Sequence, residues 1–298
     1  MIKKYLYNLI FMKRMSSERR IWKKAYKIIL AKNPVVKSKI NNQECEMPFS
    51  HNGVYYTLKY KNYDKQLKRI CDYVKSIEGG RILNIIDVGA NIGDTVLNIG
   101  DKDNNYLVVE GEKEYNQFIP QNLKGYKYIL EECFCGEKDE NDVGVSINME
   151  SGTAKLTFSE TQCEHIDVKT IDSIVDHHNF KPDILKIDTD GFDFKVLRGA
   201  QKILSLYKPV LFFEWTINEL EQVGENPISI FPFLESMGYE QLIVFDNYGN
   251  FMCQMSSGDR NLLKQLIEYT RCEVIYYFDV CAINKESNLE SRDLIKNF

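Results

Sequence analysis

No long apolar run occurs in the sequence. Its longest hydrophobic stretches are far shorter than the roughly 20 residues that a helix needs to cross a bilayer. The basic start, MIKKYLYNLIFMKR, contains an interrupted apolar stretch, and no small-residue cleavage site follows it, so it does not match a secretion signal. We therefore expect a cytoplasmic protein without a membrane span.

Paired metal-binding motifs are also absent. The eight cysteines are scattered, no CxxC pair occurs, and only Cys133 and Cys135 lie close together. The four histidines show no zinc-ligand spacing with the cysteines, which argues against a zinc site. Free thiols are typical of proteins in the reducing cytosol. We assign no metal ligand from these residues.

Charge is unevenly distributed along the 298 residues. Residues 1–40 hold twelve Lys and Arg against the single Glu18, while the whole chain has a net charge of -5, so the rest is strongly acidic. Residues 17–34 show an apolar stripe at helical spacing between basic residues, and Asn33-Pro34 ends the predicted helix. Such a helix suits an anionic membrane surface, here the inner face of the cell membrane, or a polyanionic partner. Docking on the acidic body of the protein, or on a second subunit, is the alternative that the charge favours.

From about residue 60, short apolar runs alternate with helical patterns. The runs cover 82–89, 106–110, 126–131, 183–188 and 209–215. This alternation predicts a doubly wound α/β domain with a mainly parallel sheet. Between Glu137 and Val168 the pattern changes to short alternating pieces typical of a β-hairpin insertion. We therefore expect a basic helical N-terminal extension over 1–50 and one α/β domain over 51–298.

A glycine turn follows the first of these strands. The segment reads D-x-G-x-x-x-G, from Asp87 through Gly89 to Gly93. Glycines at these positions allow a tight turn and a close approach to a ligand, and the helix that opens there offers free backbone N–H groups. Glu110 stands at the end of the next strand, 21 residues after Gly89, where a carboxylate can accept hydrogen bonds from both hydroxyls of a ribose.

The spacing of the glycines indicates which cofactor fits. Position 91 is Asn, so the central glycine of the dinucleotide fingerprint G-x-G-x-x-G is missing. Asp87 and Asp94 border the turn and would repel a pyrophosphate, whereas they suit a cationic ligand. S-adenosylmethionine (SAM) has a sulfonium and an ammonium group and no phosphate. The glycines alone would fit an ordinary strand–helix turn, but together with Glu110 they predict a SAM site.

The segment ILKIDTDGFDFKVLRGA, from Ile184, places several charges at the end of an apolar strand. In a parallel sheet Asp188 would lie at the ligand crevice, and Lys186 on the same face would need an anionic partner. A calcium loop does not fit, because Gly199 at its twelfth position offers no ligand. DTD is also typical of the metal-binding aspartates of sugar-nucleotide glycosyltransferases, and Lys186 with Asp188 could be a purely structural ion pair. Asp193 is expected to cap the following helix.

Four segments together carry a family resemblance. IIDVGANIGDT, VVEGEKE, TIDSIVDHHNFKPDILKIDTDGFDFKVLRGAQKIL and LFFEW resemble, in order and spacing, the FkbM family of SAM-dependent methyltransferases. The resemblance covers residues 82–215 and is weaker to about 285. Two features depart from the family pattern: Gly111 replaces the usual proline, and Asp190 and Asp193 replace two glutamates.

The resemblance implies a Rossmann-like class I methyltransferase fold that binds SAM and methylates oxygen on saccharides or secondary metabolites. The implied cofactor residues are Asp87, Gly89, Ala90, Asn91, Gly93, Asp94, Glu110 and Phe134. The implied acceptor-side residues are Lys186, Asp188, Asp190 and Glu214. We hypothesise that Asp188 accepts or positions the proton of an acceptor hydroxyl while Lys186 fixes its carboxylate.

Other functions and residues remain open at this point. One alternative is a metal-dependent nucleotide-sugar glycosyltransferase using DTD, and another is a non-catalytic SAM-fold module that docks through its basic helix. Nucleic acid is disfavoured as a partner, because the body is acidic and no basic groove flanks the site. The turn 247–250 is a weak candidate for acceptor contact. Four aromatic residues near it could stack on a sugar or be core, and we expect core for half of them: Tyr239, Phe245, Tyr248 and Phe251.

Overall fold

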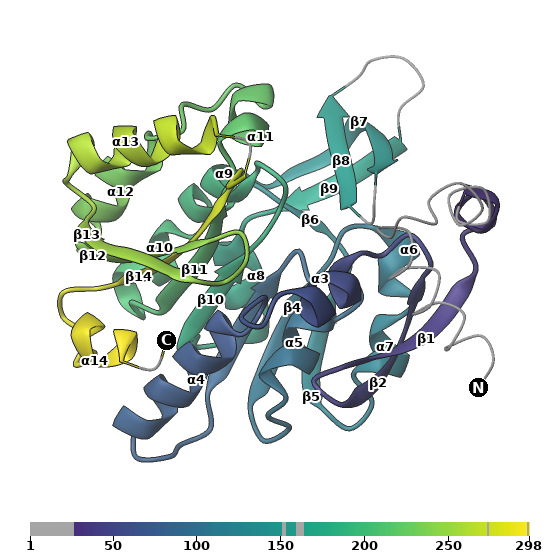
Figure 1. The fold of residues 1–298 in the computed structure, drawn as a ribbon, viewed down its shortest axis with the longest axis horizontal. Coiled ribbons are helices and arrows are strands. Elements are labelled where there is room, and N and C mark those ends of the chain that lie inside the picture. The colour runs from purple at the N-terminus through teal and green to yellow at the C-terminus, as the bar shows by residue number, and fades with distance from the viewer. Residues whose placement is uncertain (1–26, 151–152, 159–163, 273, 297) are drawn as a thin grey trace.

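The computed structural model describes residues 27–150, 153–158, 164–272, 274–296 and 298. At its centre is an eight-stranded sheet with the order β13-β12-β14-β11-β10-β3-β4-β5 (Figure 1). Its strands are β3 (Asn84–Val88), β4 (Asn105–Val109), β5 (Lys127–Glu131), β10 (Ile184–Ile187), β11 (Val210–Trp215), β12 (Gln241–Asp246), β13 (Phe251–Ser256) and β14 (Phe278–Ile283). The five strands from β11 to β5 in this order are parallel, and β14, β12 and β13 pair antiparallel at the other edge. The predicted doubly wound, mainly parallel sheet is confirmed.

Each strand of the central sheet contributes alternate side chains to two cores, because successive residues of a strand point to opposite faces. Ile85 belongs to one core and Ile86 to the other. The first core packs against the N-terminal elements and α4 (Gln66–Ile77), which precedes β3. It also packs against the short helices that follow β3 and β4, which are α5 (Asp94–Ile99), α6 (Lys113–Asn116) and α7 (Ile119–Asn122), and against α14 (Ser291–Ile295) near the C-terminus.

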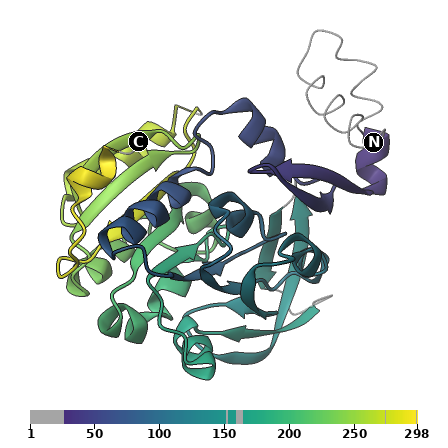
Figure 2. The ribbon, with the colours of Figure 1, turned by 90° about the horizontal axis from the view of Figure 1, so that it is seen from below.

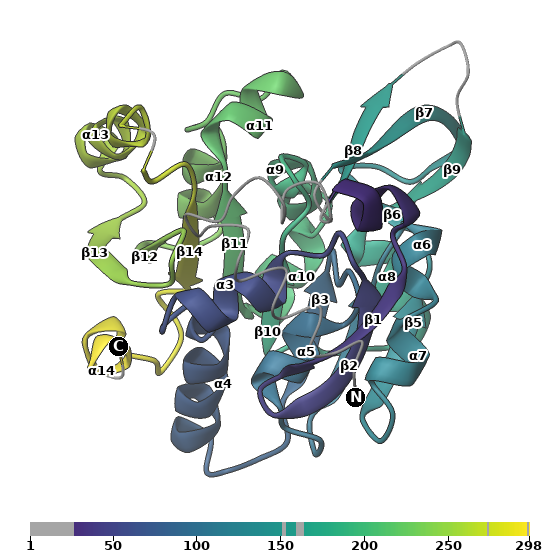
Figure 3. The same ribbon diagram turned by 45° about the vertical axis from the view of Figure 1, so that its right-hand side comes forward.

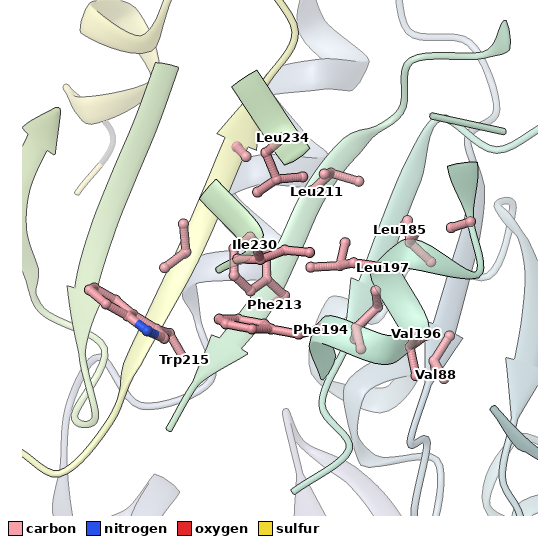
Figure 4. Packing of buried hydrophobic residues seen from close by; sticks show 14 of the residues in the cluster. Val88, Leu185, Phe194, Val196, Leu197, Leu211, Phe213, Trp215, Ile230 and Leu234 are labelled. Carbon is pink, nitrogen blue, oxygen red and sulfur yellow. The ribbon is translucent and has the colours of Figure 1, made fainter. Parts of the chain in front are cut away.

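The second core lies under the helices of the opposite face. These are α8 (Ile171–His178), α9 (Asp193–Arg198), α10 (Gln201–Leu206), α11 (Ile217–Gln222), α12 (Ile230–Ser236) and α13 (Arg260–Thr270). Figure 4 shows this packing, with Phe194 of α9 and Ile230 of α12 against Phe213 of β11. Phe213 and Phe194 are fully buried, so α9 is held firmly against the strand ends that precede it. No helix in the described part of the chain has the length and apolar character to span a bilayer.

The predicted insertion is present and larger than a hairpin. β6 (Phe134–Cys135), β7 (Glu140–Glu150), β8 (Thr153–Phe158) and β9 (Glu164–Lys169) form a four-stranded sheet in the order β6-β9-β7-β8. Figure 1 shows this second sheet standing away from the central one. β7 and β8 pair antiparallel as a hairpin, while β6 pairs with β9 and ties the insertion back to the chain after β5.

The N-terminal segment is helical only over 27–32 within its described part, and the stripe residues before Lys27 lie outside it. After Pro34 come two antiparallel strands, β1 (Val35–Ile40) and β2 (Gln43–Pro48), and then α3 (Gly53–Lys59) (Figure 2). Asn41 and Asn42 both have positive φ, which suits a tight two-residue hairpin turn. The sequence prediction of a helical extension is therefore wrong for 35–48, where alternate burial favours strands.

The hairpin packs on the body of the protein. Met47 and Ile40 are buried in the first core, and Ile29 and Leu30 of the helical stretch rest against it. The exposed fraction of the neighbouring Ile28 is 63%. Ile29 and Leu30, at the described end of the basic segment, thus pack on the first core, and the docking partner of that segment stays a prediction.

Candidate active site

The carboxyl ends of β3, β4, β10 and β11 meet at one cavity of about 670 Å³. This is where open parallel sheets bind ligands, and the volume is within the usual range for small-molecule sites. The loops after these strands form one side of the cavity. The other side comes from residues 51–56 and 63–68, and from the C-terminal residues 247–248 and 276–279.

The glycine turn approaches the neighbouring strand closely. Gly89 has φ +72°, and a Cβ there would lie 1.8 Å from the carbonyl oxygen of Asp188. Gly89 is therefore required by the contact with the end of β10, as well as by the left-handed turn. Gly93, with φ +83°, precedes α5, and a Cβ there would meet the side chain of Leu123. Both glycines bring the start of α5 against the sheet.

Glu110 is held at the cavity by two backbone N–H groups. Asn91 donates to Oε2 and Glu112 donates to Oε1, each at 2.7 Å. Burial raises the pKa of Glu110 to about 7, although these two hydrogen bonds lower it. Each carboxylate oxygen has a second lone pair, so Glu110 can still accept hydrogen bonds from ribose hydroxyls.

Phe134 lies beside Glu110 and explains a departure from the family pattern. A Cβ at Gly111 would lie 2.5 Å from the ring of Phe134. The ring fills the space that the usual proline would need, so glycine at 111 and phenylalanine at 134 go together. Phe134 lines the cavity, where its ring can stack on an adenine.

These residues fit SAM on the chemistry of their side chains. A buried acid for ribose hydroxyls stands next to an aromatic ring for the base. Among the described lining residues the only lysines or arginines are Lys68 and Lys186, and both already pair with a carboxylate, with Asp72 and Asp87 respectively. The lining therefore offers no cationic side chain for a phosphate but suits a cationic cofactor.

The remaining predicted cofactor residues divide into two groups. Asn91 and Asp94 line the cavity, and Asp94 lies 3.6 Å from the ring of His51. Burial alone would raise the pKa of Asp94, but the hydrogen bond with His51 lowers it. Asp87, Ala90 and Gly93 do not line the cavity and are fully buried behind the turn. For these three, direct contact with a cofactor stays a prediction.

Lys186 finds its expected anionic partner on the neighbouring strand. Its Nζ lies 3.0 Å from Asp87 Oδ1 and 3.7 Å from Asp188 Oδ2, and it donates to the carbonyl of Gly89 at 2.9 Å. Burial would lower the pKa of Lys186, but Asp87 and Asp188 together raise it, so the amine is charged. Lys186 thus binds both the glycine turn and the acceptor-side acid.

The three predicted acceptor-side acids come together. Oxygens of Asp188, Asp190 and Glu214 lie within 4.8 Å of one another. The side chain of Asp188 is 51% exposed toward the cavity, between Lys186 and the open space. Burial, and next the charge of Asp188, raise the pKa of Glu214 well above its usual value, while Thr216 donates a hydrogen bond to it at 2.6 Å.

Asp193 is the first residue of α9 and lies away from the cavity. It is 1% exposed and accepts hydrogen bonds from the backbone N–H and hydroxyl of Thr189. It therefore fastens the turn before α9, a structural role at the start of the helix. Burial raises its pKa to about 7, with the charge of Asp188 adding to the effect.

Sequence reasoning missed most of the opposite wall. Tyr56, Tyr63, Asp64, Tyr277 and Asp279 line the cavity, although more than 200 positions separate the two segments. The one indication was the turn at 247–250, of which Asn247 and Tyr248 line the cavity. The four aromatic residues near it divide as expected: Tyr239 and Phe245 are core, while Tyr248 and Phe251 are not.

The fold is that of a class I methyltransferase domain, and the side chains at the cavity fit SAM. Residues 87–240, just over half of the chain, match the family described as "Methyltransferase FkbM domain". The chain belongs to the FkbM methyltransferase family, and the resemblance seen in the sequence is confirmed. None of the curated proteins compared with it matches.

The solved structures that match the chain share little sequence identity with it. A methyltransferase FkbM from Methylobacillus flagellatus is 17% identical with a TM-score of 0.42, over 59% of this chain and 43% of that one. A precorrin-6y C5,15-methyltransferase from Geobacter metallireducens is 14% identical with a TM-score of 0.36, over 68% and 81% of the two chains. A putative O-methyltransferase from Klebsiella pneumoniae is 11% identical with a TM-score of 0.38, over 95% and 98%. The chain thus spans less than half of the length of the Methylobacillus protein.

Proposed function

We propose that the protein is a SAM-dependent O-methyltransferase that acts on a hydroxyl group of a saccharide or another small molecule. One observation carries the proposal: a ribose-reading acid and an acid suited to proton removal line the same cavity. Glu110 and Phe134 lie on the cofactor side, and Asp188 lies on the acceptor side. Lys186 contacts the glycine turn and Asp188 at once.

The mechanism follows from these positions. Glu110 and Phe134 would hold SAM, which would supply an electrophilic methyl group on a cationic sulfur, with a neutral thioether as the leaving group. Asp188 hydrogen-bonds the acceptor hydroxyl and receives its proton as the oxygen attacks. Lys186 holds the Asp188 carboxylate in place, which fixes the direction of attack. Glu214, whose pKa is raised by burial and next by the charge of Asp188, lies beside Asp188 and can form a further hydrogen bond with the acceptor.

A metal-dependent nucleotide-sugar glycosyltransferase is the second candidate. The cluster of Asp188, Asp190 and Glu214 favours it, because three carboxylates this close could hold a divalent ion. The cavity chemistry opposes it, because a diphosphate would face many carboxylates, while Lys68 and Lys186 are already paired.

Calorimetric titration separates the two candidates. The protein would be titrated with SAM, and separately with UDP-glucose plus manganese, and both titrations repeated on Glu110→Ala. We expect saturable SAM binding that Glu110→Ala abolishes, and no binding of UDP-glucose. Binding of UDP-glucose with manganese, and none of SAM, would replace the methyltransferase by the glycosyltransferase.

The role of the basic N-terminal segment also stays a proposal. Ile29 and Leu30 pack against the first core. We propose that the protein is cytoplasmic and that its basic N-terminal segment adds contacts with the inner surface of the cell membrane or with a second copy of the chain. Flotation with vesicles containing anionic lipid, using the full chain and a variant without residues 1–33, tests this. Equal flotation of both proteins would remove membrane binding from the proposal, as equal elution in size exclusion would remove self-association.

A further inference from the structure

One wall of the cavity is built where a segment from the first quarter of the chain contacts a segment from its last quarter. Gln66, at the start of α4, donates a hydrogen bond at 2.9 Å to Asp279 of β14. Asn62 bonds Asn250 at 3.0 Å, and Figure 3 shows α3 and α4 beside the strands that end the chain. Asp279 is the register partner of Glu214 on the neighbouring strand, so this wall adjoins the predicted acceptor-side acids and forms the acceptor side of the proposed active site.

The cavity lining has a strong excess of acidic over basic side chains. Eight carboxylates line it against two lysines, both already paired. The carboxylates are Asp64, Asp94, Glu110, Asp188, Asp190, Glu214, Glu219 and Asp279. SAM brings one net positive charge, from its sulfonium and ammonium less its carboxylate. Most of the excess therefore remains for the acceptor to balance.

The excess is concentrated on the acceptor side. Burial raises the pKa of Asp279 well above its usual value, and the charges of Asp188 and Asp64 raise it further. The pKa of Asp64 is raised in the same way, by burial and then by Asp94 and Asp188. Carboxylates that repel each other in a buried site are stabilised by a cation placed between them. The acceptor side is thus prepared for positive charge.

Aromatic rings complete this wall. Tyr56, Tyr63, Tyr248, Tyr276 and Tyr277 line the cavity, and the rings of Tyr56 and Tyr63 stack at 5.3 Å. Tyrosine faces attract ammonium groups, whereas divalent metal ions prefer oxygen ligands alone. The combination of carboxylates and tyrosine faces therefore favours an organic ammonium over a metal ion.

A buried amide adds an unused hydrogen-bond acceptor. Asn247 lines the cavity and is 4% exposed, and its Oδ1 accepts no hydrogen bond from the described residues. Buried polar atoms are nearly always hydrogen-bonded, so an unsatisfied buried acceptor atom on a residue of the cavity wall points to a ligand that donates. An N–H or O–H of a bound molecule would satisfy it.

We infer that the acceptor is a cation: an amino-saccharide or a similar polyhydroxylated amine. Its protonated amino group lies between Asp64, Asp279 and the tyrosine faces, while one of its hydroxyl groups meets Asp188. The inference rests on the proposed function, which it narrows to a substrate class. The ammonium group acts as an anchor and is not the atom methylated. Neutral saccharides of the same shape would lack this anchor.

The test uses neamine, a pseudodisaccharide with four amino groups, and its tetra-N-acetyl derivative, which keeps the rings and hydroxyls but loses the charges. Both are titrated calorimetrically into the full chain saturated with S-adenosylhomocysteine (SAH). We expect neamine to bind and the acetylated compound to bind at least about tenfold more weakly, since charge-assisted hydrogen bonds contribute this much or more.

Variants locate the binding. Asp279→Asn keeps an oxygen for Gln66 and removes the charge, and Asp64→Asn removes the second charge. Each should weaken neamine binding about tenfold with unchanged SAH affinity. Glu268→Gln, on the exposed face of α13, is the matched control and should change nothing.

Four results would overturn the inference while leaving the proposed function intact: SAH binding without neamine binding, equal binding of the acetylated compound, an equal effect of Glu268→Gln, or magnesium binding that Asp279→Asn removes. Absence of SAH binding would instead remove the proposed function itself.

Discussion

Lys186 and Asp87 form a buried ion pair across two neighbouring parallel strands, with 3.0 Å between Nζ and Oδ1. The register of β10 and β3 places the two residues directly opposite each other. Asp87 is fully buried, and burial raises its pKa while Lys186 lowers it. The pair therefore fixes the start of the glycine turn relative to the strand that ends in Asp188.

Removing one member of this pair should destabilise the protein strongly. Lys186→Met leaves Asp87 buried without its cation, which typically costs about 3–5 kcal/mol in the free energy of unfolding. Adding Asp87→Asn removes the isolated charge and should recover part of that loss. Urea unfolding of the two single variants and the double variant measures the coupling. Strictly additive effects would show that the pair is not coupled in the folded state.

The contact between Gly111 and Phe134 gives a second prediction. Gly111→Ala places a Cβ 2.5 Å from the Phe134 ring, so the ring must move and the affinity for SAM should fall about tenfold or more. Gly258→Ala is the matched control, because the only tight approach of its new Cβ is to the flexible end of Glu235, with Ser256 Oγ at an ordinary 3.6 Å. SAM titration of both variants checks this. If Gly111→Ala binds SAM like the wild type, Phe134 does not contact the cofactor.

Much of the fold and half of the site could be predicted from local patterns. Short local sequence patterns are enough to predict strands β3, β4, β10 and β11, the glycine turn, Glu110 and Lys186. The hairpin at 35–48 was missed because its alternate burial is visible only once Met47 and Ile40 have a core to enter.

The acceptor wall could not be predicted for a different reason. Tyr63 and Asp279 have no motif around them, and they meet only because the N-terminal elements fold over the strand ends. The partner of Lys186 was also missed. The sequence analysis assigned Asp87 to the cofactor turn. The parallel register of β3 and β10, two strands far apart in the sequence, instead places Asp87 directly opposite Lys186.

Asp193 predicts a pH dependence of stability. Its pKa is about 7 in the folded protein and 3.8 in its ordinary environment. The folded state therefore holds this proton more tightly than the unfolded chain does. The stabilisation is fully present below about pH 4 and is lost as the pH rises to about 7, with a magnitude of up to about 4 kcal/mol.

Asp193→Asn isolates that effect. The amide can still accept from Thr189, so the turn before α9 should persist while the titration disappears. Urea unfolding between pH 4 and 8 should show a smaller fall in stability with rising pH for Asp193→Asn than for the wild type. Glu110, with a pKa of about 7, contributes the same sign and is unchanged in both proteins. Parallel curves for the two proteins would contradict the assignment to Asp193.

Asp188 predicts a separation between catalysis and cofactor binding. Asp188→Asn cannot take the proton of an acceptor hydroxyl, so kcat for SAH formation should fall about 100-fold or more. SAM affinity should change little, because Glu110 and Phe134 hold the cofactor from the other side of the cavity. An unchanged kcat with a raised KM would instead show that Asp188 only binds the acceptor, and the proton would leave by another route.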